Sequence, residues 1–264
     1  MIDPLTIITN PKIAALKPCW ANFRGFSLLF DNPGPSFPSM GEGLCRLDCP
    51  VYATGALAML TGLAMAVEEV RQQLPVEKYA FCPLPPFSYH VTVWDGLNES
   101  NMQQLSPATR KWLDDWFLGL PHSLLSENDL TRAAETSSLV TSADQHVSFE
   151  FKDLFNFDDT AVLARLQAAD PDSEKQLDRI VKMRTELASI YARDFGIAPP
   201  ADYLPHVTLG YFANKNRASA FSADMPAWSK VVQKHTARTT ITFKRIGFYG
   251  FTDMVTFFKR LRKE

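Results

Sequence analysis

The sequence contains one succession of elements twice, and this repeat constrains the fold more than any other feature. In each copy, apolar residues at helical spacing are followed by a proline-bearing extended stretch and then by a strand that opens His-Val-Thr. The helices are predicted over residues 54–74 and 173–196, and the motifs occupy residues 90–92 and 206–208. The repeat predicts an α/β fold of two lobes with pseudo-two-fold symmetry, with antiparallel sheets around a central cleft and helices outside.

The rest of the chain fits one bilobed domain spanning residues 1–264. Ser106 and Pro107 predict the N-cap and first turn of another helix, and Ser173 with Gln176 forms a capping box for the long helix. We expect residues 1–22 to be irregular and residues 120–145 to be rich in loops. Segment 160–166 is predicted to be a strand, although Leu163 and Leu166 also fit a helix. The other predicted strands cover residues 26–30, 79–82, 89–94, 146–151, 206–212, 239–248 and 254–261, with the last pair joined through Gly250.

Composition excludes several classes of protein and of partner. The chain has 264 residues, of which 46% are hydrophobic and 21% charged, with a formal net charge of -2. These values are typical of a globular protein and exclude disordered, collagen-like and coiled-coil chains. The charge also excludes broad cationic capture of nucleic acid, so a polynucleotide partner would need a local site.

The chain lacks the sequence features of membrane or exported proteins. Its longest apolar run, residues 55–67, is shorter than the roughly 20 residues of a spanning helix. Asp3 and Pro4 stand where a secretory signal would carry basic residues. We therefore expect a cytoplasmic monomer with reduced cysteines. Cys45 and Cys49 could form half of a metal site, but no second pair of ligands has matching spacing, and we expect no metal and no cofactor.

The two His-Val-Thr strands carry the chemistry. Side chains alternate faces along a strand, so His90 points the same way as Thr92, and His206 the same way as Thr208. Two imidazoles and two hydroxyls that face one cleft suit in-line displacement at phosphorus, because one imidazole accepts a proton while the other donates one. Asp95 lies at an odd offset from His90 and would face away, so the ligand inventory favours a mechanism without metal.

The short motif also occurs by chance, and this chain provides an example. Residues 146–148 read His-Val-Ser, but no long helix and proline crossing precede His146. We therefore assign the paired site to His90 and His206. The alternative is that these histidines only satisfy hydrogen bonds within a strand. His122 and His235 lack the pattern, and we expect them at the surface.

The sequence resembles the 2H phosphoesterases, which are named for two His-x-Thr/Ser motifs and include RNA 2',3'-cyclic phosphodiesterases and 2'-5' RNA ligases. Residues 84–95 (LPPFSYHVTVWD) resemble a bacterial subfamily known as a domain of unknown function, and residues 204–211 (LPHVTLGY) are similar to the second signature of the family. The resemblance extends over residues 23–261. It implies a duplicated two-lobed fold and a metal-independent reaction. It also implies that the two motif histidines are acid and base and that the two motif threonines bind the phosphate.

The resemblance leaves the substrate open. The leading hypothesis is hydrolysis of the 2',3'-cyclic phosphate of a nucleotide or an RNA terminus. The alternatives are a phosphodiesterase for 2'-5'-linked or cyclic oligonucleotides, a nucleotide-binding module with little turnover, and a structural protein whose histidines are incidental. Arg24 is a candidate phosphate ligand, with a solvated arginine as the alternative. Tyrosines that could stack on a nucleobase, or else belong to the core, are Tyr89, Tyr203, Tyr211 and Tyr249.

Overall fold

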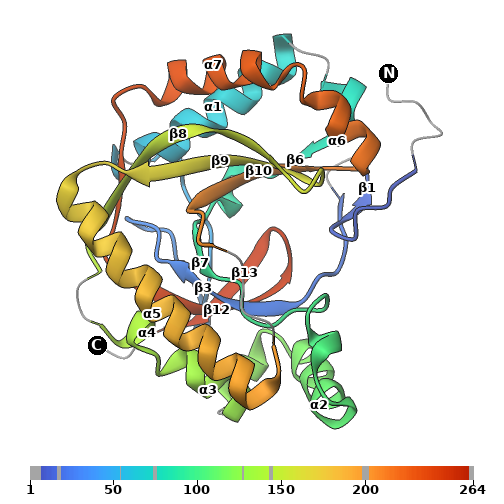
Figure 1. The fold of residues 1–264 in the computed structure, drawn as a ribbon, viewed down its shortest axis with the longest axis vertical. Helices are drawn as coiled ribbons and strands as arrows, with labels where there is room; N and C mark the ends of the chain where they lie inside the picture. The colour runs from blue at the N-terminus through green and yellow to red at the C-terminus, as the bar shows by residue number, and fades with distance from the viewer. Residues whose placement is uncertain are drawn as a thin grey trace.

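A computed structural model of the protein describes residues 7–16, 19–53, 55–73, 76–126, 128–142, 145–197 and 202–261. It has a mixed α/β architecture with antiparallel sheets, which confirms the predicted class (Figure 1). The α-helices are α1 (Ala58–Gln73), α2 (Pro107–Leu118), α3 (Asp129–Glu135), α4 (Ser138–Thr141), α5 (Pro171–Phe195), α6 (Lys215–Phe221) and α7 (Met225–Thr236). The strands are β1 (Ile13–Ala15), β2 (Cys19–Trp20), β3 (Gly25–Phe30), β4 (Ser39–Gly41), β5 (Leu44–Arg46), β6 (Phe81–Pro83), β7 (Thr92–Trp94), β8 (Val147–Phe157), β9 (Ala161–Ala168), β10 (His206–Phe212), β11 (Ile241–Phe243), β12 (Ile246–Asp253) and β13 (Thr256–Arg260).

The strands of the described chain form a five-stranded sheet, a six-stranded sheet and a small hairpin. The five-stranded sheet has the order β11-β8-β9-β10-β6, the six-stranded sheet has the order β4-β5-β13-β12-β3-β7, and β1 pairs with β2. The chain crosses between the large sheets in both directions. Strand β6 pairs with β10 through Pro83 and Gly210, and β12 pairs with β3 through Tyr249 and Ser27. Each sheet is therefore built from both halves of the chain.

Helices cover the outside of the sheets (Figure 1). Helices α1 and α7 pack together and cover the five-stranded sheet, and α2 to α5 lie on the other side of the molecule. The long helix α5 spans from β8 and β9 to the six-stranded sheet, where Tyr191 packs against Phe26 and Trp94 with ring centroids 6.4 and 4.6 Å away. The amphipathic helices thus bury their apolar faces against both sheets.

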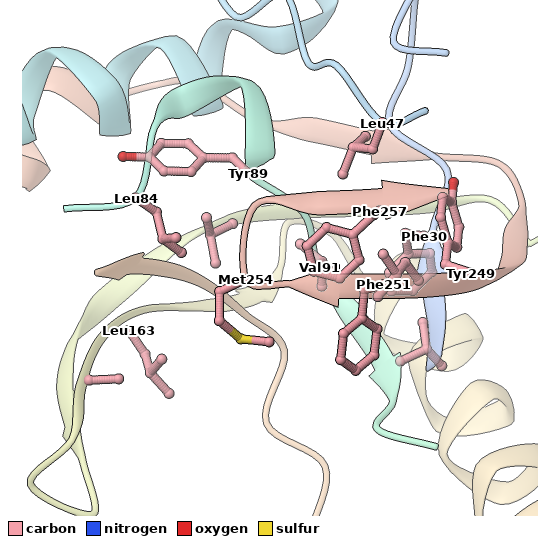
Figure 2. Packing of buried hydrophobic residues seen from close by; sticks show 14 of the residues in the cluster. Phe30, Leu47, Leu84, Tyr89, Val91, Leu163, Tyr249, Phe251, Met254 and Phe257 are labelled. Carbon is pink, nitrogen blue, oxygen red and sulfur yellow. The ribbon is translucent and has the colours of Figure 1, made fainter. Parts of the chain in front are cut away.

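The hydrophobic core continues from one sheet to the other. Figure 2 shows buried side chains from both sheets around Val91, which is 0% exposed. The ring of Phe30 on β3 lies 5.7 Å from Phe149 on β8 and 4.8 Å from Phe243 on β11, measured between centroids. These contacts join the two sheets, so the core fixes the position of one sheet against the other.

Segment 160–166 is a strand, as predicted, because β9 lies between β8 and β10 and pairs with both. Other predicted boundaries were wrong. The strand predicted over residues 89–94 is shorter, because β7 begins only at Thr92. Residues 120–145 contain α3 and α4, which are too short to show a clear helical period. The closing segment forms β11, β12 and β13, and Gly250 lies inside β12 rather than at a turn.

Two other local predictions needed correction. Helix α5 has Asp170 as its N-cap, whose carboxylate accepts a hydrogen bond from the backbone N–H of Ser173 at 2.7 Å. The Ser173 hydroxyl instead accepts a hydrogen bond from the backbone N–H of Ser148 at 2.9 Å. The lead-in 1–22 contains the β1-β2 hairpin, although residues 1–6 and 17–18 lie outside the described part. Within the described ranges, no helix is long and apolar enough to cross a membrane.

Candidate active site

Both His-Val-Thr segments line one cavity of about 570 Å³. His90 reaches it from the segment just before β7, and Thr92 from the first residue of β7 in the six-stranded sheet. His206 and Thr208 reach it from β10 in the five-stranded sheet. All four side chains are half-buried. The structure therefore brings the four predicted catalytic residues together although they come from different sheets.

The two segments meet in a crossed register. Val91 and Val207 form an isolated antiparallel bridge, and both side chains are 0% exposed. Extended by one residue in each direction, this register sets His90 opposite Thr208, and Thr92 opposite His206. Because side chains alternate along extended backbone, the valines point into the core and their neighbours point to the cavity. A register continued in this way would place each imidazole across from the hydroxyl of the other segment.

The same backbone contact orients both imidazoles. The Nδ1 atom of His90 lies 2.7 Å from the carbonyl oxygen of Ser88, and Nδ1 of His206 lies 2.7 Å from the carbonyl oxygen of Leu204. A carbonyl can only accept, so Nδ1 is the protonated nitrogen in each ring. The Nε2 atom of each neutral imidazole is left as an acceptor, and a charged imidazole would donate from the same atom. Each histidine can therefore accept or donate a proton through Nε2.

Burial lowers the pKa of both histidines. The pKa of His90 falls from 6.5 to about 4, chiefly because burial disfavours the charged ring, and the charges of His206 and Lys12 lower it further. The Phe257 ring packs against the imidazole of His90 with centroids 4.4 Å apart. Burial also lowers the pKa of His206, but the carboxylate of Asp95 acts in the opposite direction there. The two imidazoles therefore occupy unequal electrostatic surroundings.

The first motif is held in place by residues from the second half of the chain. The hydroxyl of Tyr203 donates a hydrogen bond to the carbonyl oxygen of Thr92 at 3.0 Å. From α5, Nε of Arg184 donates to the carbonyl oxygen of Val93 at 3.0 Å, and its guanidinium lies 5.3 Å from the centre of the Tyr203 ring. Arg184 also lines the cavity. Arg184 was not predicted from the sequence, because a single arginine within an amphipathic helix carries no recognisable signal.

The weaker site candidates divide into two groups. Tyr203 and Tyr211 line the cavity. Tyr89 is 1% exposed and Tyr249 is 0% exposed, so both belong to the core. Arg24 forms an ion pair with Glu99 at 3.2 Å and is absent from the lining of the cavity.

Lys12 and Phe157 are among the further residues that line the cavity and were not predicted. Asp95 lines it too and acts on His206, so the expectation that Asp95 faces away was wrong. Lys12 lies in the turn before β1, within the segment expected to be irregular. Phe157 ends β8 and is 51% exposed, beyond the strand predicted over residues 146–151. Only the alternation of strand β8, followed as far as the Asp158-Asp159 turn, could have indicated Phe157.

The remaining histidines and cysteines lie away from this cavity lining. His146 is exposed ahead of β8, and His122 is exposed and faces Glu42 at 3.4 Å. His235 is half-buried against α1, where Nε2 lies 2.5 Å from a carboxylate oxygen of Glu69, so it is not the surface residue that we expected.

Metal ligands do not cluster in the described chain. Within it, no group of three or more His, Cys, Asp or Glu side chains is placed to hold a metal ion. Cys45 and Cys49 are buried free thiols, and burial raises the pKa of Cys49 to about 12.

Comparison with known proteins supports the fold alone. No protein-family model and no curated protein matches the sequence. The chain is similar in structure to the crystal structure of a conserved protein of unknown function from Agrobacterium tumefaciens, with a TM-score of 0.51 and 14% sequence identity. The match covers 95% of this chain and 89% of that chain, so the similarity extends over the entire architecture rather than one sheet.

Proposed function

We propose that the protein is a metal-independent phosphodiesterase that hydrolyses the 2',3'-cyclic phosphate of a nucleotide or of an RNA end. The observation that carries the proposal is the crossed pairing of the two His-Val-Thr segments around one cavity. A phosphate held between the segments would meet one imidazole and one hydroxyl on each side. In-line displacement needs this arrangement, because the attacking and leaving oxygens lie on opposite sides of phosphorus.

The proposed reaction uses one neutral and one charged imidazole. The neutral ring takes a proton from water through Nε2 while the water oxygen forms a bond to phosphorus. The bond between phosphorus and one ribose oxygen breaks, and that oxygen receives a proton from the charged ring. The products are a phosphomonoester and a free hydroxyl, and the two histidines exchange protonation states. Each proton transfer contributes about 10²- to 10⁴-fold to the rate.

The unequal surroundings of the histidines support a division of roles. We assign His90 as the base, because its lowered pKa keeps it neutral near pH 7. We assign His206 as the acid, because the carboxylate of Asp95 opposes the lowering of its pKa by burial, whereas no carboxylate in the described part of the chain acts on His90 in this way. A bound phosphate adds negative charge beside both rings and raises the pKa of each, which favours protonation of the acid when substrate is present.

The cavity supports a nucleotide rather than a simple phosphate ester. Its volume of about 570 Å³ lies within the range of small-molecule sites, roughly 300 to 1,000 Å³. Tyr203, Tyr211 and the half-exposed Phe157 provide aromatic rings at its walls and rim, and any nucleobase can stack on such a ring. The net charge of -2 suits a mononucleotide or a chain end better than a long RNA.

The proposal extends to the family and to its fold. Helix α1 precedes β7 with the first motif, and helix α5 precedes β10 with the second. This order supports an internal duplication of the kind that the resemblance to the 2H phosphoesterases implies. We therefore propose that the chain belongs to that family, on the basis of its two motifs and the bridge between them.

The proposal is tested by turnover in the presence of a metal chelator. The purified protein is given 2',3'-cyclic mononucleotides, 2'-5'-linked oligonucleotides and cyclic dinucleotides, and products are separated by chromatography. We expect turnover of the 2',3'-cyclic mononucleotides. His90→Ala and His206→Ala should each lower kcat by at least about 100-fold.

The matched control is His146→Ala, which alters the exposed His-Val-Ser segment outside the cavity. It should retain the wild-type rate, and circular dichroism should show that all three variants are folded. If the protein turns over only the oligonucleotides, the two-histidine mechanism would stand and the proposed 2',3'-cyclic substrate would be wrong. Nucleotide binding without turnover between pH 5 and 9 would contradict the enzymatic proposal and leave a binding module.

A further inference from the structure

A lysine from the N-terminal segment reaches the cavity that contains the two motifs. Lys12 lies in the turn that leads into β1 and lines the cavity with His90, Thr92, His206 and Thr208. None of the sequence patterns that identified the motifs involves this segment. Lys12 therefore brings a cation to the site from a third part of the chain, outside both large sheets.

The backbone around Lys12 is anchored to the strand that carries the second motif. The side-chain amide of Asn10, which is 7% exposed, donates hydrogen bonds to the carbonyl oxygens of Phe212 at 2.9 Å and Thr160 at 3.2 Å. Its side-chain oxygen accepts a hydrogen bond from the backbone N–H of Lys12 at 3.1 Å. The backbone N–H of Asn10 also donates to the carbonyl oxygen of Ala213 at 3.0 Å. These bonds fix the base of the Lys12 side chain relative to the end of β10.

The ammonium of Lys12 rests on aromatic rings rather than on a carboxylate. Its Nζ lies 5.0 Å from the centre of the Tyr211 ring and 5.2 Å from that of Phe23. Within the described ranges it forms no ion pair with an Asp or Glu side chain. Aromatic faces attract a cation without neutralising it, so the positive charge stays available to an anion in the cavity.

The charge of Lys12 already acts on both histidines. It lowers the pKa of His90 and that of His206, so it lies close enough to affect both imidazoles. The positive charge of Lys12 would therefore also attract an anion placed between the imidazoles. Arg24, the cation that the sequence favoured, has its charge paired with Glu99 and is absent from the cavity lining.

We propose that Lys12 is a phosphate-binding residue whose ammonium contacts a non-bridging oxygen of the phosphate held between the two His-Val-Thr segments. The inference rests on the proposed function for the position of the phosphate. It adds a ligand that no motif supplies, and it makes the turn before β1 part of the site. A fixed positive charge also stabilises the charge that the transferring phosphoryl group carries in the transition state.

Binding of a reaction product tests the proposal without requiring turnover. Isothermal titration calorimetry is performed with adenosine 3'-monophosphate and, separately, with adenosine. Lys12→Gln should weaken binding of adenosine 3'-monophosphate by about tenfold or more and leave adenosine unchanged, because only the nucleotide carries the anion. Lys12→Arg should restore most of the affinity. The control Lys230→Gln removes an exposed lysine on α7, outside the cavity, and should bind as the wild type does.

A second measurement separates a binding role from a structural one. Histidine titration by NMR in the empty protein should show higher pKa values for His90 and His206 in Lys12→Gln, because a neighbouring positive charge has been removed. Equal losses for nucleotide and adenosine, unchanged affinity in Lys12→Gln, or no binding of the nucleotide to the wild type would each overturn the proposal. A wild type that binds the nucleotide through Lys12 but hydrolyses none of the diesters would overturn the proposed function instead.

Discussion

The direction in which the side chains of the site point is set mainly by the alternation of side chains along a strand. His90 and Thr92 share one face, Val91 takes the other, and the second motif repeats the pattern. This part of the site could be predicted from the sequence, because the period of a strand is known without any partner. The crossed register between the motifs could not be predicted, since it depends on how the two sheets meet at Val91 and Val207.

Because the two motifs have the same sequence, we predict equivalent roles for their threonines. Thr92→Val and Thr208→Val each remove a hydroxyl while retaining the shape of the side chain. Each should lower kcat/KM for a 2',3'-cyclic nucleotide by about 10- to 100-fold, the value of a hydrogen bond to a charged group. Thr92→Ser and Thr208→Ser should keep most of the activity in the same steady-state assay. A full-rate Val variant would show that its hydroxyl does not contact the phosphate.

The low pKa of His90 also affects stability. The unfolded chain binds a proton at this imidazole below pH 6.5, whereas the folded protein binds it only below about pH 4. The folded state is therefore favoured above pH 6.5, and stability falls as the pH drops from 6.5 to about 4. The loss that this group contributes is at most about 3.5 kcal/mol, since each unit of pKa difference is worth ~1.4 kcal/mol.

Urea unfolding of the wild type and His90→Gln at several pH values measures this contribution. The difference in unfolding free energy between the two proteins should change across the window from pH 6.5 to 4 and stay constant above it. Parallel curves for the two proteins throughout this window would contradict the assigned pKa.

At the scale of elements, the sequence was most informative where a turn residue or cap marks a boundary. The bounds of β10 agree with the predicted strand over residues 206–212, and α5 ends at Gly196 as expected. The start of α5 was misassigned because Asp170 and Ser173 are both good N-caps, and only the tertiary contact of Ser173 with Ser148 distinguishes them. The same limitation hid Lys12, whose position depends on the bonds between Asn10 and β10.

The end of α5 provides a prediction about an element. Gly196 adopts a left-handed conformation with φ of 70°, and a Cβ there would meet nothing within 4 Å. Gly196→Ala should therefore lose stability through backbone strain alone, by about 1 kcal/mol. Gly55→Ala is the matched control, because Gly55 is equally open and has no left-handed φ. The Tm of Gly196→Ala should be lower than that of the wild type, and the Tm of Gly55→Ala should be equal to it or higher. A Tm of Gly196→Ala above that of Gly55→Ala would contradict the role of Gly196 as the C-cap of α5.

For the whole molecule, the sheets are interleaved. Strand β6 from the first half completes the five-stranded sheet, and β12 and β13 from the end of the chain complete the six-stranded sheet. The repeat in the sequence predicted paired units, but not this exchange of strands, because the pairing partners are far apart in the chain. Neither half contains either of the two large sheets complete, and the site needs side chains from both.

This interleaving predicts a single cooperative unfolding transition. Far-UV circular dichroism and tryptophan fluorescence should give the same midpoint, since Trp94 lies in the six-stranded sheet and Trp228 packs over the five-stranded one. Separate midpoints for the two signals would show that the sheets unfold independently.

The central claim is that two histidines act on one phosphate, His90 as base and His206 as acid, and the pH dependence of kcat/KM tests it most directly. For hydrolysis of a 2',3'-cyclic mononucleotide in chelator, the wild type should give a bell-shaped profile. The residual activity of His90→Ala should lose the acidic limb, and that of His206→Ala should lose the alkaline limb. If the wild type shows no turnover, or if both variants retain both limbs of the profile, catalysis by His90 and His206 is contradicted.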